Sequence, residues 1–241
     1  MTMPAVPQTA MVMAAGKGTR MMPLTANTPK PLLKVAGTTL LDHVLDLLRD
    51  AGVGRIVVNV HYLADQIEAH LTQYATDFSL SLSDERALLR DTGGGLVQAL
   101  PLIAGDPFLC INADNWFADT KVHALHRMRE MWDAECMDIL MLVVPFERAG
   151  NTQGAGDFDL DPVGRLSREG PKRARPYVWT GIQLLAKRVV ADPPDAAFST
   201  NVFWDRAIEQ GRCFGLVHDG DWFDVGYPKA IGMTEARLAL G

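Results

Sequence analysis

The chain has few of the features that would assign it to several large classes of protein. Its 241 residues carry 23 Lys and Arg against 29 Asp and Glu, a formal net charge of −6, so it lacks the basic balance typical of nucleic-acid-binding proteins. The three cysteines, Cys110, Cys136 and Cys213, are far apart and form no C-x-x-C pair, which favours buried reduced thiols over disulfides or a zinc site. No apolar run approaches the ~18 residues that span a bilayer. We therefore expect neither a nucleic-acid partner nor a membrane partner.

The first eight residues lack the basic start of a signal peptide. They contain Pro4 and Pro7 and no Lys or Arg, so they read as a tail before the first strand. The expected compartment is the cytoplasm.

The order of apolar patterns predicts an α/β fold. Strand patterns alternate with helical ones through the first half of the chain. Strands are expected over 10–15, 55–60, 80–83 and 107–112, and helices over 39–50, 63–74 and 95–100. Such alternation predicts a single-domain, Rossmann-like, doubly wound and mainly parallel sheet.

The second half, from residue 136, has a different pattern. Strands are expected over 139–144, 177–185, 214–218 and 222–224, helices over 201–210 and 227–240, and a hairpin turn over 161–164 between the segments 157–160 and 165–167. The turn residues Asp161, Pro162 and Gly164 predict a small antiparallel subregion. No linker or repeat divides the chain, so one domain over 1–241 is expected, with halves 9–135 and 136–241.

A glycine-rich turn follows the first predicted strand. It consists of Ala14, Ala15, Gly16, Lys17, Gly18, Thr19 and Arg20. Such a turn brings backbone N–H groups close to a phosphate, and Lys17, Arg20 and the later Lys30 add three cations suited to a polyphosphate. The P-loop spacing is absent, and Met21 stands where a dinucleotide fingerprint needs its third glycine.

The longer pattern G-x-G-T-R-x-x-P-x-T-x-x-x-P-K-P, from Gly16 to Pro31, resembles the signature of the sugar-nucleotidyltransferase family. These enzymes join a sugar 1-phosphate to a nucleoside triphosphate and release pyrophosphate, with Mg²⁺ as cofactor. The resemblance implies that Lys17 and Arg20 hold the triphosphate and that Lys30 contacts the α-phosphate or the sugar phosphate, which makes Lys30 and Arg20 the catalytic candidates. It also implies that residues 9–135 form the nucleotide half and 136–241 the sugar half.

Two aspartates are candidates for holding Mg²⁺, which prefers oxygen ligands. Asp114 follows the strand 107–112, and Asp224 lies in the sequence W-F-D-V-G. Both match the family pattern of metal-binding aspartates, although Ala113 stands where a glycine is more typical. Asn112, at the same strand end, is expected to contact the nucleotide.

The sequence D-T-G-G-G, starting at Asp91, is a second glycine-rich segment before a helix. Its glycines permit close backbone approach to a ligand, or Asp91 or Thr92 simply caps the helix. The family places such a turn against the base and ribose, so Thr92, Gly93 and Gly94 are expected to bind the nucleotide.

Two segments of the second half resemble the sugar pocket of the muramate-specific branch of the family. They are G-D-F from Gly156 and W-T-G-I from Trp179, and they give Gly156, Asp157, Thr180 and Gly181 as sugar contacts. Asn201 is a further sugar candidate or a helix cap. The branch implies UTP and N-acetylmuramate 1-phosphate, used in peptidoglycan recycling.

Several alternatives remain open from the sequence. The same chemistry fits mannose 1-phosphate with GTP, glucose 1-phosphate with UTP or dTTP, and phosphocholine with CTP. A non-catalytic nucleotide-sugar sensor would be free to lose the cations and aspartates, and a glycosyltransferase usually has a D-x-D motif that N-A-D at 112–114 lacks. Both a monomer and a small homo-oligomer are compatible with the sequence.

Overall fold

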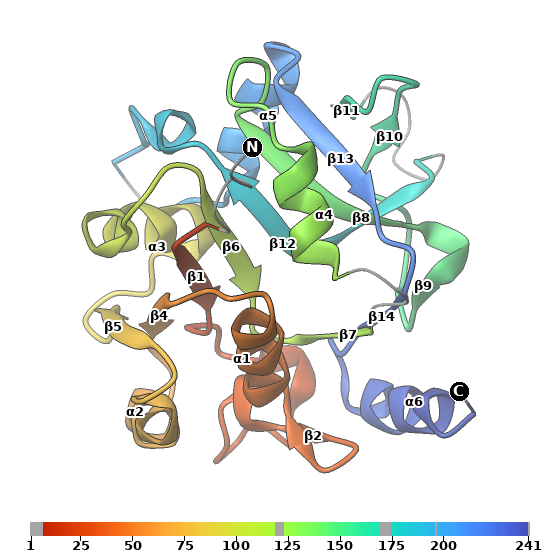
Figure 1. Ribbon diagram of the computed structural model, residues 1–241. Helices are drawn as coiled ribbons and strands as arrows, with labels where there is room; N and C mark the ends of the chain where they lie inside the picture. The colour runs from red at the N-terminus through yellow and green to blue at the C-terminus, as the bar shows by residue number, and fades with distance from the viewer. Residues whose placement is uncertain (1–6, 119–122, 169–174, 196, 241) are drawn as a thin grey trace.

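A seven-stranded β-sheet forms the centre of the computed structural model, which describes residues 7–118, 123–168, 175–195 and 197–240 (Figure 1). In spatial order the strands are β13 (Cys213–Val217), β8 (Ile139–Pro145), β12 (Tyr177–Leu185), β6 (Phe108–Asn112), β1 (Thr9–Met13), β4 (Arg55–Val60) and β5 (Ser79–Asp84). Neighbouring strands are parallel from β6 to β5 and between β13 and β8, and β12 is antiparallel to both of its neighbours. The predicted mainly parallel sheet is confirmed.

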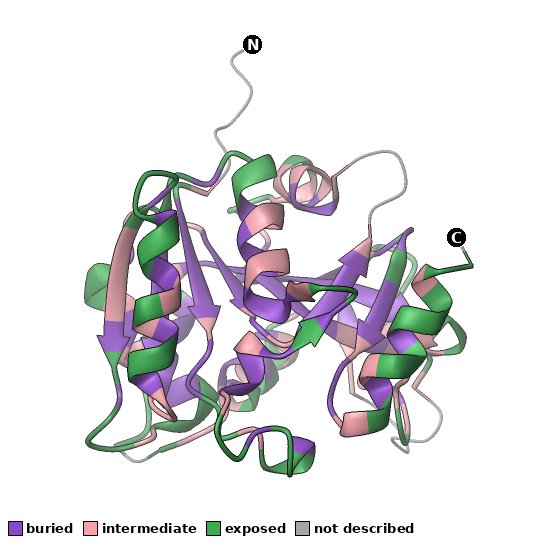
Figure 2. Ribbon diagram, turned by 90° about the horizontal axis from the view of Figure 1, so that it is seen from below, coloured by how far each residue is buried: buried purple, intermediate pink, exposed green. Residues whose placement is uncertain are grey.

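Helices cover both faces of this sheet because successive strand residues point to opposite faces. In β1, Ala10 and Val12 join the apolar cluster that includes α1, α2 and α4, whereas Met11 joins the cluster that includes α3 and α5. The helices are α1 (Leu40–Asp50), α2 (Ala64–Leu71), α3 (Asp91–Ala99), α4 (Ala124–Met131), α5 (Asn201–Glu209) and α6 (Pro228–Leu238). Figure 2 shows the buried strands between helices whose outer faces are exposed. The doubly wound fold is thus confirmed.

Three small sheets lie outside the central one. Their strands are β7 (Asn115–Ala118), β14 (Asp221–Asp224) and β9 (Ala149–Gly150); β10 (Asp159–Leu160) and β11 (Leu166–Ser167); and β2 (Lys34–Val35) and β3 (Thr38–Thr39). The antiparallel β10–β11 hairpin turns at 161–164, as predicted, and β14 pairs antiparallel with β7 but parallel with β9. Because β7 follows β6 after a two-residue turn, β14 is brought next to the end of β6.

Short 3₁₀ helices complete the chain. They are η1 (Thr19–Met21), η2 (Lys30–Leu32), η3 (Thr72–Tyr74), η4 (Leu100–Leu102), η5 (Phe146–Arg148) and η7 (Lys187–Val190). The predicted helix over 63–74 is therefore α2 continued as η3, and the predicted strand over 10–15 ends earlier, at Met13.

The start of α3 differs from the prediction. The helix begins at Asp91, so all three glycines lie inside it and are buried, and the expectation that they precede a helix starting at Gly95 is wrong. A Cβ on Gly93 would lie 2.5 Å from the Phe198 ring, and one on Gly95 would lie 2.6 Å from Glu85 Oε1. Close packing against neighbouring side chains therefore explains the glycines at these two positions.

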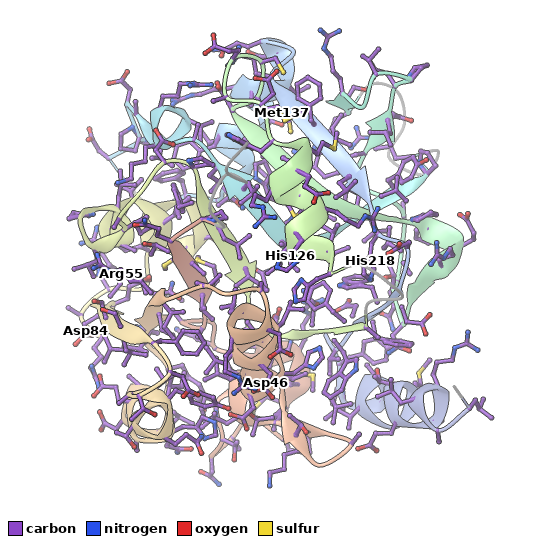
Figure 3. All side chains as sticks on the ribbon, in the orientation of Figure 1. Asp46, Arg55, Asp84, His126, Met137 and His218 are labelled. Carbon is purple, nitrogen blue, oxygen red and sulfur yellow. The ribbon has the colours of Figure 1, made fainter. Side chains whose placement is uncertain are left out.

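The surface and the cysteines agree with the composition. Charged side chains such as Arg55 and Asp84 are exposed at the ends of strands (Figure 3). Cys110 and Cys213 are free and buried as predicted, and burial raises the pKa of each thiol to about 12. The prediction of a buried thiol is wrong for Cys136, which is free but only half-buried. Among the residues that the structure describes, no helix is both long and apolar enough to cross a membrane.

Candidate active site

Two cavities meet at the carboxyl ends of β1 and β6, the edge where open α/β sheets bind ligands. The first, called here the glycine-loop cavity, has a volume of about 300 Å³ and is lined by Met13, Ala14, Ala15, Gly16, Gly18, Thr19, Arg20, Met21, Lys30, Pro31, Asn59, Glu85, Leu89, Asp91, Thr92, Asn112, Asp114 and Gly226. The second, the β12 cavity, has a volume of about 730 Å³ and is lined by Arg20, Asn112, Asp114, Asn115, Thr152, Gln153, Gly154, Ala155, Asp157, Val178, Trp179, Gly181, Trp222 and Asp224. Arg20, Asn112 and Asp114 line both cavities, so two ligands bound there would meet at these three residues.

The glycine-rich turn is fixed by close contacts. Gly18 has a φ of 62°, a conformation that favours glycine, and a Cβ there would lie 3.0 Å from Thr25 Cγ2. The buried Thr25 hydroxyl donates a hydrogen bond to the Gly18 carbonyl over 2.9 Å. The threonine of the signature thus serves to hold the turn.

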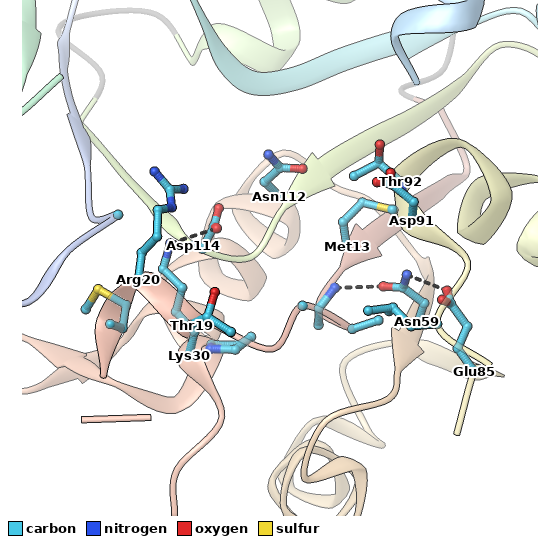
Figure 4. Close-up of a pocket in the computed structure, with 18 residues that line it drawn as sticks. Met13, Thr19, Arg20, Lys30, Asn59, Glu85, Asp91, Thr92, Asn112 and Asp114 are labelled. Atoms are coloured by element: carbon cyan, nitrogen blue, oxygen red, sulfur yellow. Dashed lines mark hydrogen bonds and ion pairs between the residues drawn. The ribbon is translucent and has the colours of Figure 1, made fainter. Parts of the chain in front are cut away.

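A cluster of four charged groups occupies the junction of the two cavities: Arg20, Lys30, Asp114 and Asp224. Lys30 is only 7% exposed, and its Nζ lies 2.8 Å from Asp114 Oδ2 (Figure 4). Prolines precede and follow Lys30, which restricts its backbone at the start of η2. Arg20 extends into the same region from η1. Lys17, by contrast, is exposed and is not among the residues that line either cavity.

Asp224 is the fourth charged group, and it lines the β12 cavity together with Arg20 and Asp114. Burial raises the pKa of its carboxyl group above the usual range, and the nearby Asp114 carboxylate adds to the increase, whereas Lys30 and Arg20 oppose it. Asp114, just after β6, and Asp224, in β14, are widely separated in the sequence but interact electrostatically in the fold.

A buried network that the sequence analysis did not identify supports the glycine-rich turn. The Ala14 N–H donates to Asn59 Oδ1 over 2.7 Å, and Asn59 Nδ2 donates to Glu85 Oε1 over 2.8 Å (Figure 4). Glu85 Oε2 in turn accepts the Arg90 N–H over 3.0 Å, just before α3. Asn59 and Glu85 are almost fully buried polar residues beside the ends of β4 and β5, and two polar residues near strand ends were the available signal in the sequence.

The segment from Asp91 places its predicted residues differently. Asp91 and Thr92 line the glycine-loop cavity, and the Thr92 hydroxyl accepts the Thr200 N–H over 3.0 Å. The Gly93 and Gly94 N–H groups both donate to the Phe198 carbonyl, and neither residue is among those that line the cavity. These two glycines are therefore engaged in packing α3.

The predicted sugar residues also divide into two groups. Asp157 and Gly181 line the β12 cavity, and a Cβ on Gly181 would lie 2.4 Å from Asn115 Nδ2. Thr180 is fully buried, and its hydroxyl donates a hydrogen bond to the Leu142 carbonyl. Gly156 packs against the Arg175 carbonyl. Asn201 is exposed, and its side-chain oxygen accepts a hydrogen bond from Arg168. These last three residues do not line the cavity, so the structure does not bring them to the site as predicted.

The donor set at the junction fits a magnesium ion. Among the described residues no group of three or more His, Cys, Asp or Glu side chains is placed to hold a metal. Mg²⁺ in phosphate-binding sites typically uses one or two carboxylates and completes its shell with water and substrate phosphate. Asp114 and Asp224 supply two carboxylates, which is the number that such a site uses. Asp114 already attracts a cation, since Lys30 Nζ lies at hydrogen-bond distance from its carboxylate.

Comparison with known proteins places this site in context. Residues 9–239 match the model of the nucleotidyl transferase family. The chain is 48% identical to N-acetylmuramate alpha-1-phosphate uridylyltransferase of Neisseria meningitidis, over 96% of this chain and 98% of that protein. It is 38% identical to the protein of the same name from Caulobacter vibrioides, over 98% and 99% of the two chains.

Solved structures show the same fold. HddC from Yersinia pseudotuberculosis complexed with GMP-PN superposes with a TM-score of 0.77 at 21% identity, over 95% of this chain and 99% of that one. The inositol-1-phosphate CTP transferase from T. maritima gives a TM-score of 0.76 at 16% identity, over 96% and 97%. Since the glycine signature, the cavity behind it and nearly the full length of the sequence all agree, this chain belongs to the nucleotidyl transferase family, whose members include sugar-phosphate nucleotidyltransferases.

Proposed function

We propose that the protein transfers the uridylyl group of UTP to N-acetylmuramate 1-phosphate and releases pyrophosphate, as a Mg²⁺-dependent cytoplasmic step of peptidoglycan recycling. The observation that carries the proposal is the meeting of two cavities at Arg20, Asn112 and Asp114, because a transfer between two substrates needs them to touch at one charged junction. The choice of substrates is supported by the two relatives of that name, which align over nearly the full chain.

The chemical step is a substitution at the α-phosphorus. A phosphate oxygen of the sugar 1-phosphate forms the new P–O bond, while the bond from the α-phosphorus to the bridging oxygen of the β-phosphate breaks and pyrophosphate departs. Catalysis of such a step consists mainly of positioning and of neutralising negative charge. In this site Lys30 and Arg20 supply fixed positive charge where the two cavities join, and Arg20 can hold phosphate oxygens bidentately.

Asp114 and Asp224 would hold the magnesium ion. When bound, Mg²⁺ neutralises the triphosphate and stabilises the charge that develops on its oxygens. Ala14, Ala15, Gly16 and Gly18 of the glycine-rich turn line the smaller cavity and would receive the nucleotide.

The test is a grid of nucleoside triphosphates against sugar 1-phosphates, with Mg²⁺-dependent pyrophosphate release as the readout. Release that peaks with UTP and N-acetylmuramate 1-phosphate is the expected result. A peak with another pair would keep the chemistry and overturn the substrate assignment. Nucleotide binding without release from any pair would overturn the enzymatic proposal.

A further inference from the structure

Strand β12 is irregular at the point where it passes the small sheet of β7, β14 and β9. Its register with β8 shifts between Trp179 and Gln183, and its pairing with β6 begins only at Ile182. Among the described strands no residue is in register with Thr180 or Gly181. These two residues therefore form a bulge, which leaves backbone groups outside the regular hydrogen bonding of the sheet.

The bulge has a fixed conformation. Thr180 is fully buried, and its hydroxyl donates to the carbonyl of Leu142 in the neighbouring strand β8 over 2.8 Å. Gly181 has a φ of 90°, in the left-handed region that favours glycine. The threonine hydroxyl and the glycine backbone together hold the peptide group between these two residues in place.

The Thr180 carbonyl accepts two hydrogen bonds from side chains of the small sheet. Asn115 Nδ2 of β7 donates to it over 3.0 Å, and Trp222 Nε1 of β14 donates to it over 2.9 Å. Both side chains are buried, so each donor needs a partner inside the protein. A Cβ on Gly181 would lie 2.4 Å from Asn115 Nδ2, so a larger residue there would displace the amide. One backbone oxygen of β12 therefore holds two strands of the small sheet.

These two strands place the candidate metal carboxylates. Asn115 follows Asp114 directly in the chain and is in register with Asp224 across the β7–β14 pair. The Cβ atoms of residues opposite each other in an antiparallel pair lie about 5 Å apart. Trp222 precedes Asp224 by two residues, so the two side chains extend from the same face of β14. The side chains that contact the Thr180 carbonyl are thus immediate neighbours of both aspartates.

We propose that Asn115 and Trp222 are positioning residues of the metal site, which hold Asp114 and Asp224 in place for a divalent cation through the Thr180 carbonyl. The proposal rests on the proposed function, since it takes the two aspartates as the magnesium ligands. The side-chain N–H groups of Asn115 and Trp222 are engaged by the carbonyl, so the two residues act on the ion through the strands that they hold.

The test is a titration with Mn²⁺ in the absence of nucleotide, with free Mn²⁺ measured by electron paramagnetic resonance. Asn115→Ala and Trp222→Phe each remove one donor to the Thr180 carbonyl. Each variant is expected to bind Mn²⁺ about tenfold more weakly than the wild type, the lower end of the effect of groups that orient metal ligands. Trp222→Phe is the milder change in shape and gives a second measurement if Asn115→Ala is not folded.

Trp204→Phe is the matched control for general loosening of the fold. Trp204 is a buried tryptophan that lines neither cavity, and its Nε1 donates to Gln183 Oε1 over 2.9 Å. Both tryptophan variants lose one indole hydrogen bond, so the folding equilibrium constant, measured by urea unfolding without metal, should fall at least about tenfold in each. The Mn²⁺ affinity should fall in Trp222→Phe alone.

The outcomes separate this inference from the proposed function. An unchanged Mn²⁺ affinity in both Asn115→Ala and Trp222→Phe, or an equal loss of affinity in Trp204→Phe, would overturn the inference alone. Wild-type protein that shows the expected Mn²⁺ results but turns over no pair of substrates would overturn the proposed function and support the inference. Wild-type Mn²⁺ affinity in both Asp114→Asn and Asp224→Asn would overturn the metal assignment and the inference together.

Discussion

The two cavities of this site are built in different ways. The glycine-loop cavity is walled largely by one contiguous segment, from Met13 to Pro31, whose shape is set by Gly18, Thr25 and a buried hydrogen-bond network. The β12 cavity is more than twice as large and is assembled from Arg20 and four further segments, 112–115, 152–157, 178–181 and 222–224. A contiguous wall leaves a signature in the sequence, whereas an assembled wall leaves scattered residues. This difference explains why the first cavity was predicted more completely than the second.

Substitution of a residue that lines both cavities should have the largest effect on turnover, because it alters the binding of both substrates. Asp114→Asn removes a carboxylate charge at nearly constant shape, and turnover should fall about 10²-fold or more because the metal and its electrostatic stabilisation are weakened. Pyrophosphate release in saturating Mg²⁺ measures this. Normal turnover by the Asn variant would show that the metal assignment is wrong.

Lys30→Gln should also lower turnover on the order of 10²-fold, but for a different reason: the phosphates lose the positive charge that the Lys30 ammonium group provides beside them. It also removes the cation that contacts Asp114, so free Mn²⁺, measured without nucleotide, should bind about tenfold more tightly than to the wild type. Lys34→Gln, which removes an equal charge from an exposed position four residues away, is the control and should not change Mn²⁺ affinity. Equal Mn²⁺ affinity in wild type and Lys30→Gln would contradict the assignment of Asp114 to the metal.

Asn59→Ala should affect one cavity and leave the other intact. The substitution leaves the Ala14 N–H and Glu85 Oε1 without their partner, and the free energy of unfolding should fall by about 2 kcal/mol. The KM for UTP should rise while the KM for the sugar 1-phosphate stays constant. Urea unfolding and the two KM values measure this, with Asn27→Ala, at an exposed position, as the control. An equal rise in both KM values would show that the two cavities are not separately supported.

The smallest effect is expected away from both cavities, at Asp42. Burial works to raise the pKa of Asp42, but hydrogen bonds with Tyr74, His70 and Thr39 outweigh it, so the pKa is lowered. A lowered pKa in the folded state adds stability above the unfolded pKa, and that stability is lost as the pH falls through the folded value. Tyr74→Phe should therefore reduce the free energy of unfolding by about 1 kcal/mol at pH 7, with a smaller difference below about pH 4.

Tyr62→Phe serves as the matched control for this pH dependence. The Tyr62 hydroxyl donates to backbone carbonyls of Thr25 and Ala26, which do not titrate. Its effect on the free energy of unfolding should be constant over the same pH range. A Tyr74→Phe difference that is equally constant would show that Asp42 does not depend on the Tyr74 hydroxyl.

How much could be predicted from the sequence depended on whether local or tertiary interactions decide each feature. Helix α1 follows a helical period of apolar residues and strand β4 is a run rich in β-branched residues, and both were predicted closely. The three glycines of α3 were misplaced because tertiary contacts decide their position: Gly93 and Gly94 donate to the Phe198 carbonyl, and Gly95 packs against Glu85. Thr180 lies in a segment that matches the sugar pocket, yet its side chain points to the Leu142 carbonyl, which a pattern of letters does not encode. Asn59 and Glu85 were missed because polar residues beside strand ends gain meaning only when the strands are placed side by side.

The three residues shared by both cavities, Arg20, Asn112 and Asp114, also have a thermodynamic consequence. A ligand that engages them from one side changes the charge and hydrogen bonding offered to a ligand on the other side. Linkage is reciprocal, so the factor by which the first ligand alters the affinity for the second equals the factor in the reverse direction. Binding in the two cavities is therefore coupled through these residues, and a substitution at one of them changes the coupling free energy as well as each affinity.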